Sequence, residues 1–455
     1  MKRKLALSLI ACFALSSLAT FTGCSKGYNA QGFNENVLRV ASWDEYIDEG
    51  GEIDENGNET RALYEEFEDW YEEKTGKKIT VEYIPLQDNE TMYNKIKMGD
   101  RYDLLCPSEY MMMKLASEGW LQKYDEEFFN PAVADNYYAQ YVSPYIHEQF
   151  QTKMSDGSRW EEYIAGYMWG TTGFVFNDKI DHEVAKSWSA FYHPSCKKHI
   201  TAKDNVRDSY FVGLGLYYEN ELLALRDTLK AKENTAEYPQ ALAEYKSVLA
   251  QKMNDKSKTT MSKVKKCLEK MRANLYGLET DEGKLDIISG RLDISYQWSG
   301  DAVYILDEAE ENGYKYYYSI PESTSNLWFD GWVMMKNCNK TAAQAFVNFL
   351  SRPDNVIRNM EYVGYTSCIG GDEVFEYVVD SYAASEEDIA TGNAVPYSLD
   401  YFFGNGHLLM TSPEQTTRQL FAQYPTAETT NRLVVMEYFN KEENTRANRM
   451  WNNIK

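Results

Sequence analysis

Histidine and cysteine are scarce in this chain of 455 residues, which contains five histidines and seven cysteines. The sequence has no HExxH motif, no CxxC pair and no other metal-ligand spacing, so it predicts neither a structural nor a catalytic zinc site. When Cys12 and Cys24 near the N-terminus are set aside, five cysteines remain. An odd number of cysteines cannot all pair, and we expect a fold that does not depend on disulfide bonds.

Basic residues are few relative to acidic ones. Lysine and arginine number 47 against 70 aspartates and glutamates, a formal net charge of −23. This balance excludes a general nucleic-acid binder, whose surface is basic, and a basic patch for anionic lipid. Hydrophobic residues make up 43% of the chain and aromatic residues 14%, which excludes an intrinsically disordered protein. The length suits about two to three domains.

Long apolar runs are absent except at the N-terminus. Lys2, Arg3 and Lys4 precede a mostly apolar run over 5–20, the pattern of a secretory signal peptide and not of a membrane span. The run ends in FTGC, which resembles a bacterial lipoprotein processing box. We therefore expect a signal peptide over 1–23, lipidation at Cys24 and a polar tether over 24–36; an ordinary signal peptide with an incidental cysteine is the alternative. The protein would be extracytoplasmic and anchored to the cell membrane as a lipoprotein, at the cell surface or in the periplasmic space.

Strand and helix patterns alternate after the tether. Apolar residues predict strands over 37–42, 79–83 and 102–108, and helical spacing predicts helices ending at Gly76 and spanning 89–96 and 111–117. This alternation indicates a parallel sheet covered by helices. Ligands of such sheets bind beyond the carboxyl ends of the strands. Trp43 and Ser108 each follow a strand, so we expect them at the same edge.

Further along, two segments predict crossings between domains. The Gly-rich extended segment 164–177 leads into a second domain, and 314–321 leads back, so that 328–335 forms a strand of the first domain again. Between them, residues 219–277 are rich in Lys, Glu, Ala and Leu and predict long helices joined at 252–259. Their composition indicates a solvated helical elaboration and not a binding site.

Three short segments place aromatic residues beside carboxylates at strand or helix ends: WDEYI (43–47), WSGDA (298–302) and WFDGW (328–332). A fourth, CPSEY (106–110), offers Ser108 and Tyr110, and a fifth, DNVRD (204–208), puts Asp208 in the first turn of a helix. An organic ammonium group needs carboxylates beside aromatic rings, because carboxylates accept charge-assisted hydrogen bonds and aromatic faces attract cations. Any one segment has an ordinary explanation, since Trp and Tyr often pack in cores and neighbouring acids are often solvated.

Several of these residues lie in segments that resemble a known protein family. The chain resembles the bacterial spermidine/putrescine-binding proteins, the substrate-binding lipoproteins and periplasmic components of polyamine ABC importers. The similar segments are WDEYI, the run from EKTGKKITVEY to LQKYD (73–125), YMWGTTGFVFN (167–177), SWSAFYHPSCKKHI (187–200), WFDGWVMM (328–335), FVNFLSRPDNV (346–356) and GYTS (364–367). The similarity covers most of 37–370, weakens after 370 and is absent from about 220 to 285.

The resemblance implies an α/β fold with two lobes, of the type II periplasmic-binding-protein class. Each lobe would hold a mixed, mainly parallel sheet flanked by helices, with the ligand cleft between the lobes. Lobe 1 would comprise 37–172 with 329–373. Lobe 2 would comprise 173–328 with 374–455 and carry the helical insertion at about 220–285.

The resemblance also implies site residues. Glu45, Asp208, Asp301 and Asp330 would bind amine groups, with Asp330 as the family's most characteristic ammonium ligand. The other expected contacts are Trp43, Tyr46, Ser108, Tyr110, Trp298, Trp328 and Tyr365. Asn205 stands where spermidine binders carry an acid, and Met436 where they carry a glutamine. Together with the acid at Asp301, this favours putrescine slightly and does not exclude spermidine.

We therefore expect a monomeric binding protein that captures putrescine or spermidine and delivers it to a membrane permease, with no cofactor, no metal and no enzymatic activity. Four acids without an obvious basic partner at the site positions favour a cation over a neutral solute. A receptor for a sugar or a ferric ion is one alternative. A secreted glycoside hydrolase that uses Asp301 and Asp330 is another.

Overall fold

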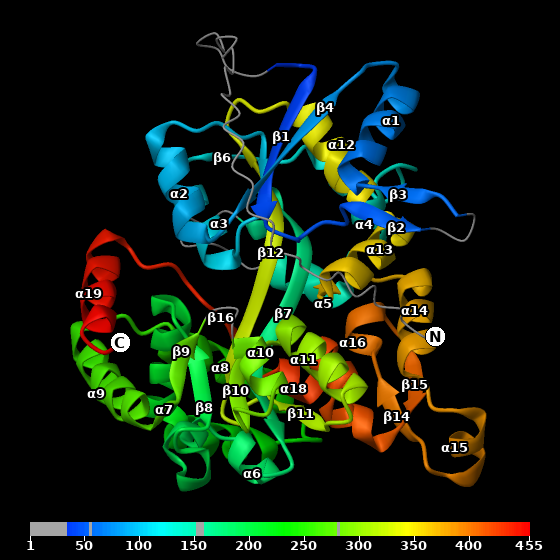
Figure 1. Cartoon of the computed structure of the whole chain (residues 1–455). Coiled ribbons are helices and arrows are strands. Elements are labelled where there is room, and N and C mark those ends of the chain that lie inside the picture. The colour runs from blue at the N-terminus through cyan, green and yellow to red at the C-terminus, as the bar shows by residue number, and fades with distance from the viewer. Residues whose placement is uncertain (1–33, 54–56, 152–158, 280–282) are drawn as a thin grey trace, which may run out of the picture.

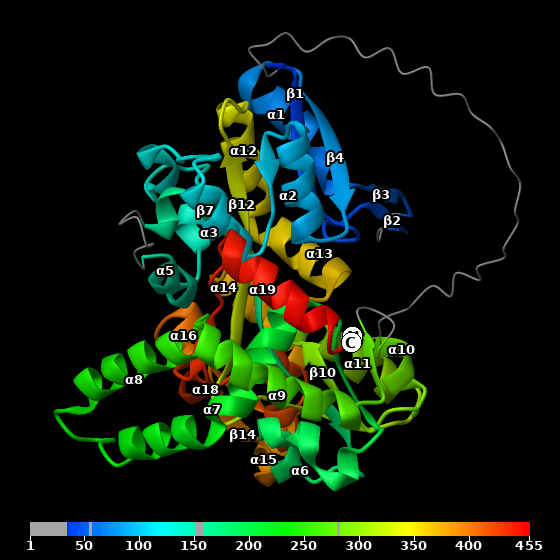
Figure 2. The same ribbon diagram turned by 90° about the vertical axis from the view of Figure 1, so that its left-hand side faces the viewer.

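The computed structural model describes residues 34–53, 57–151, 159–279 and 283–455. The expected signal peptide and Cys24 lie outside these described residues, as does most of the expected tether. Figures 1 and 2 show an upper half, at the blue end of the chain, and a lower half in green, orange and red. The five cysteines after residue 100 are all unpaired in the structure.

One mixed sheet runs through both halves in the strand order β4-β1-β5-β12-β7-β10-β8-β9. In the upper half, β4 (Thr80–Leu86), β1 (Val37–Trp43) and β5 (Leu104–Leu105) are parallel. In the lower half, β8 (Ile200–Lys203) is parallel to β10 (Ile294–Trp298) and β9 (Gly277–Glu279). Between them lie two long antiparallel strands, β7 (Ile164–Asn177) and β12 (Ser325–Met335).

Helices cover both halves (Figure 1). The upper half carries α1 (Leu63–Thr75), α2 (Asn89–Met98), α3 (Glu109–Ser117), α12 (Lys340–Leu350) and α13 (Pro353–Val363). The lower half carries α7 (Val206–Lys230), α8 (Tyr238–Met253), α9 (Lys258–Asn274) and α11 (Ser299–Glu311). The last helix, α19 (Lys441–Asn452), packs on α7 and α9 and crosses the molecule between the halves (Figure 2).

The remaining strands and α-helices are mostly short. They are β2 (Gly50–Ile53), β3 (Glu59–Arg61), β6 (Leu121–Gln122), α4 (Tyr137–Tyr141), α5 (Pro144–Phe150), α6 (His182–Ala185), α10 (Gly283–Ile288), β11 (Tyr316–Ser319), β13 (Thr366–Ser367), α14 (Asp372–Tyr382), α15 (Glu386–Thr391), β14 (Val395–Ser398), α16 (Asp400–Phe403), β15 (Leu408–Thr411), α17 (Gln419–Gln423), α18 (Ala427–Thr430) and β16 (Leu433–Val435).

Several predicted elements are confirmed. Helix α1 ends at Thr75, and Gly76 follows in the left-handed conformation at φ 70°, where its N–H donates to the carbonyl of Glu72. The extended segment 164–177 is strand β7. The long helices after residue 206 are α7, α8 and α9, and α8 and α9 are joined at 254–257.

Two predictions are wrong in part. The strand predicted over 102–108 pairs only at Leu104–Leu105, because the chain leaves the ladder before Pro107, which has no N–H to donate. The return crossover predicted at 314–321 is instead β12. Residues 316–319 form β11, which pairs with β7 at Phe174–Asn177 and stays in the lower half. Their aromatic alternation reflects a strand with one buried face, since Tyr316 and Tyr318 are buried.

The upper core depends on aromatic packing between helices and the sheet. Phe346 of α12 is fully buried, with its ring centroid 5.0 Å from that of Phe67 in α1 and 5.9 Å from that of Trp332 in β12. Both contacts are edge-to-face, the arrangement that aromatic quadrupoles favour. Phe346 thus joins two helices to the strand that carries Asp330.

We expect Phe346→Ala to lower the free energy of unfolding by about 3–5 kcal/mol, because it removes a large buried side chain and leaves a cavity. Urea denaturation measures this. The matched control is Met98→Ala, since Met98 is 77% exposed at the end of α2 and its loss is expected to change stability by less than about 0.5 kcal/mol. Equal effects of the two changes would contradict this account of the core.

Candidate functional site

Asp330 lies at the centre of the site, on β12. The register between β12 and β7 shifts between Asp330 and Gly331, and Ser108 forms an isolated bridge with Asp330. Trp43 Nε1 and Tyr46 OH both donate hydrogen bonds to Asp330 Oδ2, at 2.9 and 2.8 Å. The other carboxylate oxygen, Oδ1, is buried and accepts no hydrogen bond from the described residues. Burial raises the pKa of Asp330, and hydrogen bonding with Ser108, Tyr46 and Trp43 opposes this rise.

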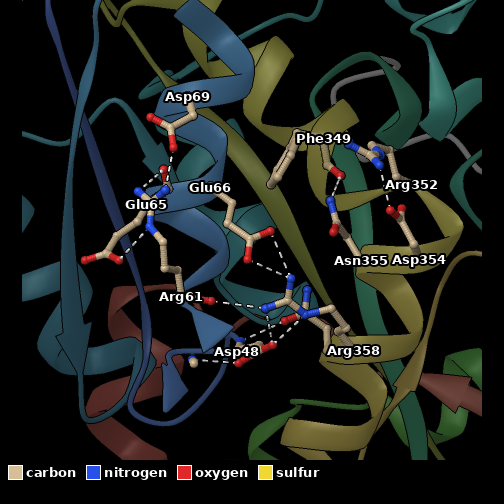
Figure 3. Close-up of polar contacts among 12 residues, drawn as sticks. Asp48, Arg61, Glu65, Glu66, Asp69, Phe349, Arg352, Asp354, Asn355 and Arg358 are labelled. Atoms are coloured by element: carbon tan, nitrogen blue, oxygen red, sulfur yellow. Dashed lines mark hydrogen bonds and ion pairs between the residues drawn. The ribbon is translucent and has the colours of Figure 1, made fainter. Parts of the chain in front are cut away.

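The loop after β1 carries Trp43 and Tyr46 and is fixed by an arginine (Figure 3). Arg358 of α13 donates to Asp48 Oδ2 at 2.9 Å and to both oxygens of Glu66 at 3.0 and 2.9 Å. It also donates to the carbonyl of Arg61 at 3.1 Å. Asp48 is buried, so its charge depends on this partner. Helices α1 and α13 therefore hold the loop against Asp330.

A buried glutamate that sequence reasoning missed lies next to Asp330. Glu109 opens α3, is 2% exposed, and accepts the N–H of Phe329 at 3.3 Å. Burial and the nearby charge of Asp330 raise the pKa of Glu109 to about 8. Its neighbour Ser108 is held by Asn89, which donates to the Ser108 hydroxyl at 3.0 Å. The sequence signal was present in PSEY, but nothing in it indicated that the glutamate is buried.

Aromatic rings connect this acidic end to the lower half. Tyr365 lies 5.8 Å from Tyr46 in an edge-to-face contact and 5.5 Å from Trp328, measured between ring centroids. Its hydroxyl donates to Asp301 Oδ1 at 3.1 Å. The ring packs directly on the start of α11, where a Cβ on Gly300 would lie 1.8 Å from it. Only glycine fits at position 300 without moving the tyrosine.

Asp301 has basic partners, contrary to the expectation of an acidic site without them. Lys203 Nζ lies 3.3 Å from Asp301 Oδ2 and 3.3 Å from Glu279 Oε1. It also lies 4.2 Å from the centre of the Trp298 ring. Lys284 Nζ lies 3.3 Å from Asp301 Oδ1. The lysines occur outside the segments that resemble the polyamine-binding proteins most closely, so motif comparison did not find them.

The helical insertion therefore reaches the site. Glu279 and Lys284 lie just after the 219–277 stretch that the sequence indicated to be a solvated elaboration, and within the insertion expected at about 220–285. Strand β9 pairs in parallel with β8 and sets Glu279 opposite Lys203. The helices also have a buried face, with Leu249 and Leu268 fully buried.

Asp208 and Tyr110 lie at the remaining wall. Asp208 accepts a short hydrogen bond from the Asn205 amide, which also caps α7. Burial raises the pKa of Asp208, and the Asn205 hydrogen bond and the Lys203 charge oppose that shift. Arg207 has its guanidinium carbon 5.3 Å from the centre of the Tyr110 ring and 4.0 Å from that of Phe439. Met436, at the position where spermidine binders carry a glutamine, is buried nearby in the core of the lower half.

The structure thus connects most of the predicted site residues through direct contacts. Glu45 is the exception: it is exposed and lies in the left-handed region at φ 51°, while its neighbours Trp43 and Tyr46 reach Asp330. The Tyr110 hydroxyl points to Glu90, at 3.2 Å. Within the described ranges, no three metal-ligating side chains are arranged to hold an ion, and no helix is long and apolar enough to cross a membrane.

Comparisons with known proteins match this architecture. Residues 62–371, more than half of the chain, match the family described as bacterial extracellular solute-binding proteins. The chain belongs to that family. The spermidine/putrescine-binding periplasmic proteins of Salmonella typhimurium and Escherichia coli are 28% and 27% identical over 188 and 184 residues. These matches span 41% and 40% of this chain and less than half of each relative, 45% and 44%.

Solved structures show the same fold over nearly the whole length. A spermidine/putrescine ABC transporter substrate-binding protein from Streptococcus pneumoniae superposes with a TM-score of 0.58 at 24% identity, covering 92% of this chain and 98% of that one. A lipoprotein of Treponema pallidum gives a TM-score of 0.59 at 17% identity, covering 92% and 99%. The predicted mixed α/β periplasmic-binding-protein fold is confirmed.

The family assignment decides the class of function. The chain belongs to a family of extracellular solute-binding proteins, which is non-enzymatic. The glycoside hydrolase alternative is therefore excluded.

We expect Arg358→Gln to lower the free energy of unfolding by about 1–3 kcal/mol, because it leaves buried Asp48 without its charged partner. It should also weaken solute binding, since the loop carrying Trp43 and Tyr46 loses its support. The control is Arg352→Gln: Arg352 lies at the start of the same helix and forms an ion pair with exposed Asp354, at 2.6 Å (Figure 3). Urea denaturation of both variants checks this, and a larger loss in the control would contradict it.

A second prediction concerns Glu109 and pH. Its folded pKa of about 8 lies above the value of roughly 4.3 for an unfolded glutamate, so the folded state binds more protons between these values. Its contribution to stability is therefore present below about pH 4 and is lost as pH rises through about 8. Glu109→Gln should remove this loss, so the stability of the variant relative to wild type rises with pH.

Urea denaturation at pH 5, 7 and 8.5 measures that difference. The control is Glu162→Gln, because a hydrogen bond from Lys123 lowers the pKa of Glu162; its contribution to stability is complete above the unfolded pKa, so its difference from wild type should stay constant over this pH range. A difference between Glu109→Gln and wild type that stays constant with pH would contradict the buried, protonated glutamate.

Proposed function

We propose that this protein captures polyamines, putrescine or spermidine, and delivers them to an ABC importer. The observation that carries the proposal is the buried carboxylate of Asp330, whose Oδ1 accepts no hydrogen bond from the described residues. The two groups that donate to its Oδ2, Trp43 Nε1 and Tyr46 OH, are neutral. A buried carboxylate without a cation is costly, and a terminal ammonium would supply both the missing hydrogen bond and the charge.

The surroundings of Asp330 favour an ammonium ion over other cations. Glu109 adds a second acid, and a bound cation would lower its pKa and release its proton near neutral pH. Indole and phenol rings at Trp43, Tyr46 and Trp328 can attract an ammonium by cation–π contacts, each about 0.5–2 kcal/mol. The rings of Trp328 and Tyr365 offer apolar faces for a methylene chain. The similarity to named spermidine/putrescine-binding proteins supports the same ligand class.

The contacts between the halves suggest a change of conformation on ligand binding that the permease would recognise. Tyr365 donates to Asp301, and Arg207 lies against Tyr110, so each pair joins the upper half to the lower. We propose that 37–172 with 329–373, and 173–328 with 374–455, move as two lobes about β7 and β12. A ligand that contacts both would favour the closed state by its differential affinity. Lipidation at Cys24 would keep the monomer near the permease.

The test is a thermal-shift titration of the purified protein with putrescine, spermidine, a neutral sugar and a ferric chelate. A ligand at about 100 times its dissociation constant adds roughly 2.7 kcal/mol to stability. We expect only the amines to raise the melting temperature. A shift with the sugar or the chelate and none with amines would replace the polyamine proposal by one of the other solutes.

Asp330→Asn should abolish the amine-induced shift, because the amide keeps the acceptor for Trp43 and Tyr46 but loses the charge. The variant should fold and melt at or above the wild-type temperature, since a buried charge is removed. The control is Asp103→Asn, another buried aspartate of the upper half, which accepts the backbone N–H groups of Arg39 and Asn339. That variant should keep its response to amines. Unchanged amine affinity in Asp330→Asn would contradict the assignment.

A further inference from the structure

Lys203 presents an ammonium group to the lower end of the site. It is the last residue of β8, and its side chain is 1% exposed. Two buried carboxylates, Asp301 and Glu279, lie 3.3 Å from Nζ, and the ring of Trp298 lies 4.2 Å away. A carboxylate pair and an aromatic face are the contacts that a free ammonium would seek.

The lysine side chain has the same chemistry as one end of a diamine. It is a compact ammonium on a flexible four-carbon stem. Because it is attached to the chain, it reaches the carboxylates at an effective concentration in the millimolar range or above. A ligand ammonium would have to displace it before contacting Asp301, and displacement would leave the lysine charge buried without partners.

We propose that Lys203 permanently occupies the second ammonium subsite, at Asp301 and Trp298, so that the cleft pairs only one ammonium of its ligand, at Asp330. This inference rests on the proposed amine-binding function and narrows its substrate class. The protein therefore recognises an alkylamine, with one terminal ammonium bound at Asp330 and an alkyl chain packed beside Trp328 and Tyr365. The second nitrogen of putrescine gains no charged partner from Asp301.

The charges on every side of Asp301 agree with this assignment. Lys284 approaches its other oxygen at 3.3 Å, and the Tyr365 hydroxyl donates to it at 3.1 Å. Glu279 also accepts a hydrogen bond from Gln297, at 3.1 Å. The carboxylates of this subsite are therefore satisfied from within the chain, whereas Asp330 Oδ1 at the other end is not.

The test compares putrescine with butylamine, which has the same chain and lacks the second ammonium. Calorimetry on the wild-type protein should give dissociation constants within threefold of each other. In Lys203→Gln, putrescine should bind at least tenfold tighter than in wild type, because Asp301 and Glu279 are released, while butylamine should change by less than threefold. Lys179→Gln removes the same charge from an exposed lysine that pairs with Asp293, and should change neither.

The outcomes separate the two proposals. If wild type binds putrescine more than tenfold tighter than butylamine, the second subsite is already open and the role of Lys203 is overturned, with amine binding intact. If wild type binds neither amine, the proposed function fails, and the inference with it. A purely structural role for Lys203 would lower the melting temperature of Lys203→Gln without changing the ratio of the two affinities. The wild-type comparison stands even if that variant does not fold.

Discussion

The antiparallel pairing of β7 with β12 is the constraint on which the rest of the structure depends. These two strands pass through both halves of the molecule. In the strand order of the main sheet, β4, β1 and β5 lie on the β12 side of this pair, and β10, β8 and β9 lie on the β7 side. The register shift beside Asp330 occurs within this pairing, at the level where the halves meet. A bulge at this point re-aims the local side chains, and Asp330 faces the loop of Trp43 and Tyr46. The position of the central carboxylate is therefore a property of the sheet.

Buried charge organises the site around that carboxylate in two different ways. At the upper end, Asp330 and Glu109 lie close together with neutral donors, and burial raises the pKa of both. At the lower end, Asp301 and Glu279 are neutralised by lysines of the same chain. Burying an unpaired carboxylate costs free energy, and pairing removes much of that cost. Under the proposed function, the cost that remains at the upper end would favour binding of a cationic solute.

Support for the site comes from residues that touch no ligand position. Arg358 holds the loop through Asp48 and Glu66, and Gly300 allows Tyr365 to pack on α11. Phe346 fixes α12 against the strand that carries Asp330. Such contacts hold binding groups in place before the solute arrives, which lowers the ordering cost of binding.

Much of this protein could be predicted from the sequence. Hydrophobic periodicity located the first helices, because burial of one face is written locally into residue order. A Gly-rich extended segment located β7, which is buried along almost its whole length. Motif resemblance named Trp43, Tyr46, Asp330 and Tyr365, whose contacts the structure shows. The sequence did not predict how short β5 is, which strand forms the return crossover, or that Glu45 is exposed. These features depend on pairing partners and backbone turns that distant residues determine.

Tertiary structure alone decided the charge balance of the site. Lys203, Glu279 and Lys284 lie between 17 and 98 positions from Asp301 in the chain, and only the pairing of β8 with β9 and β10 brings them to it. Composition indicates how many charges a chain has, and motifs indicate which acids could meet an amine. Which acids already hold a cation depends on distances of a few ångströms in three dimensions, since Coulomb energies in a buried site change steeply with distance and burial.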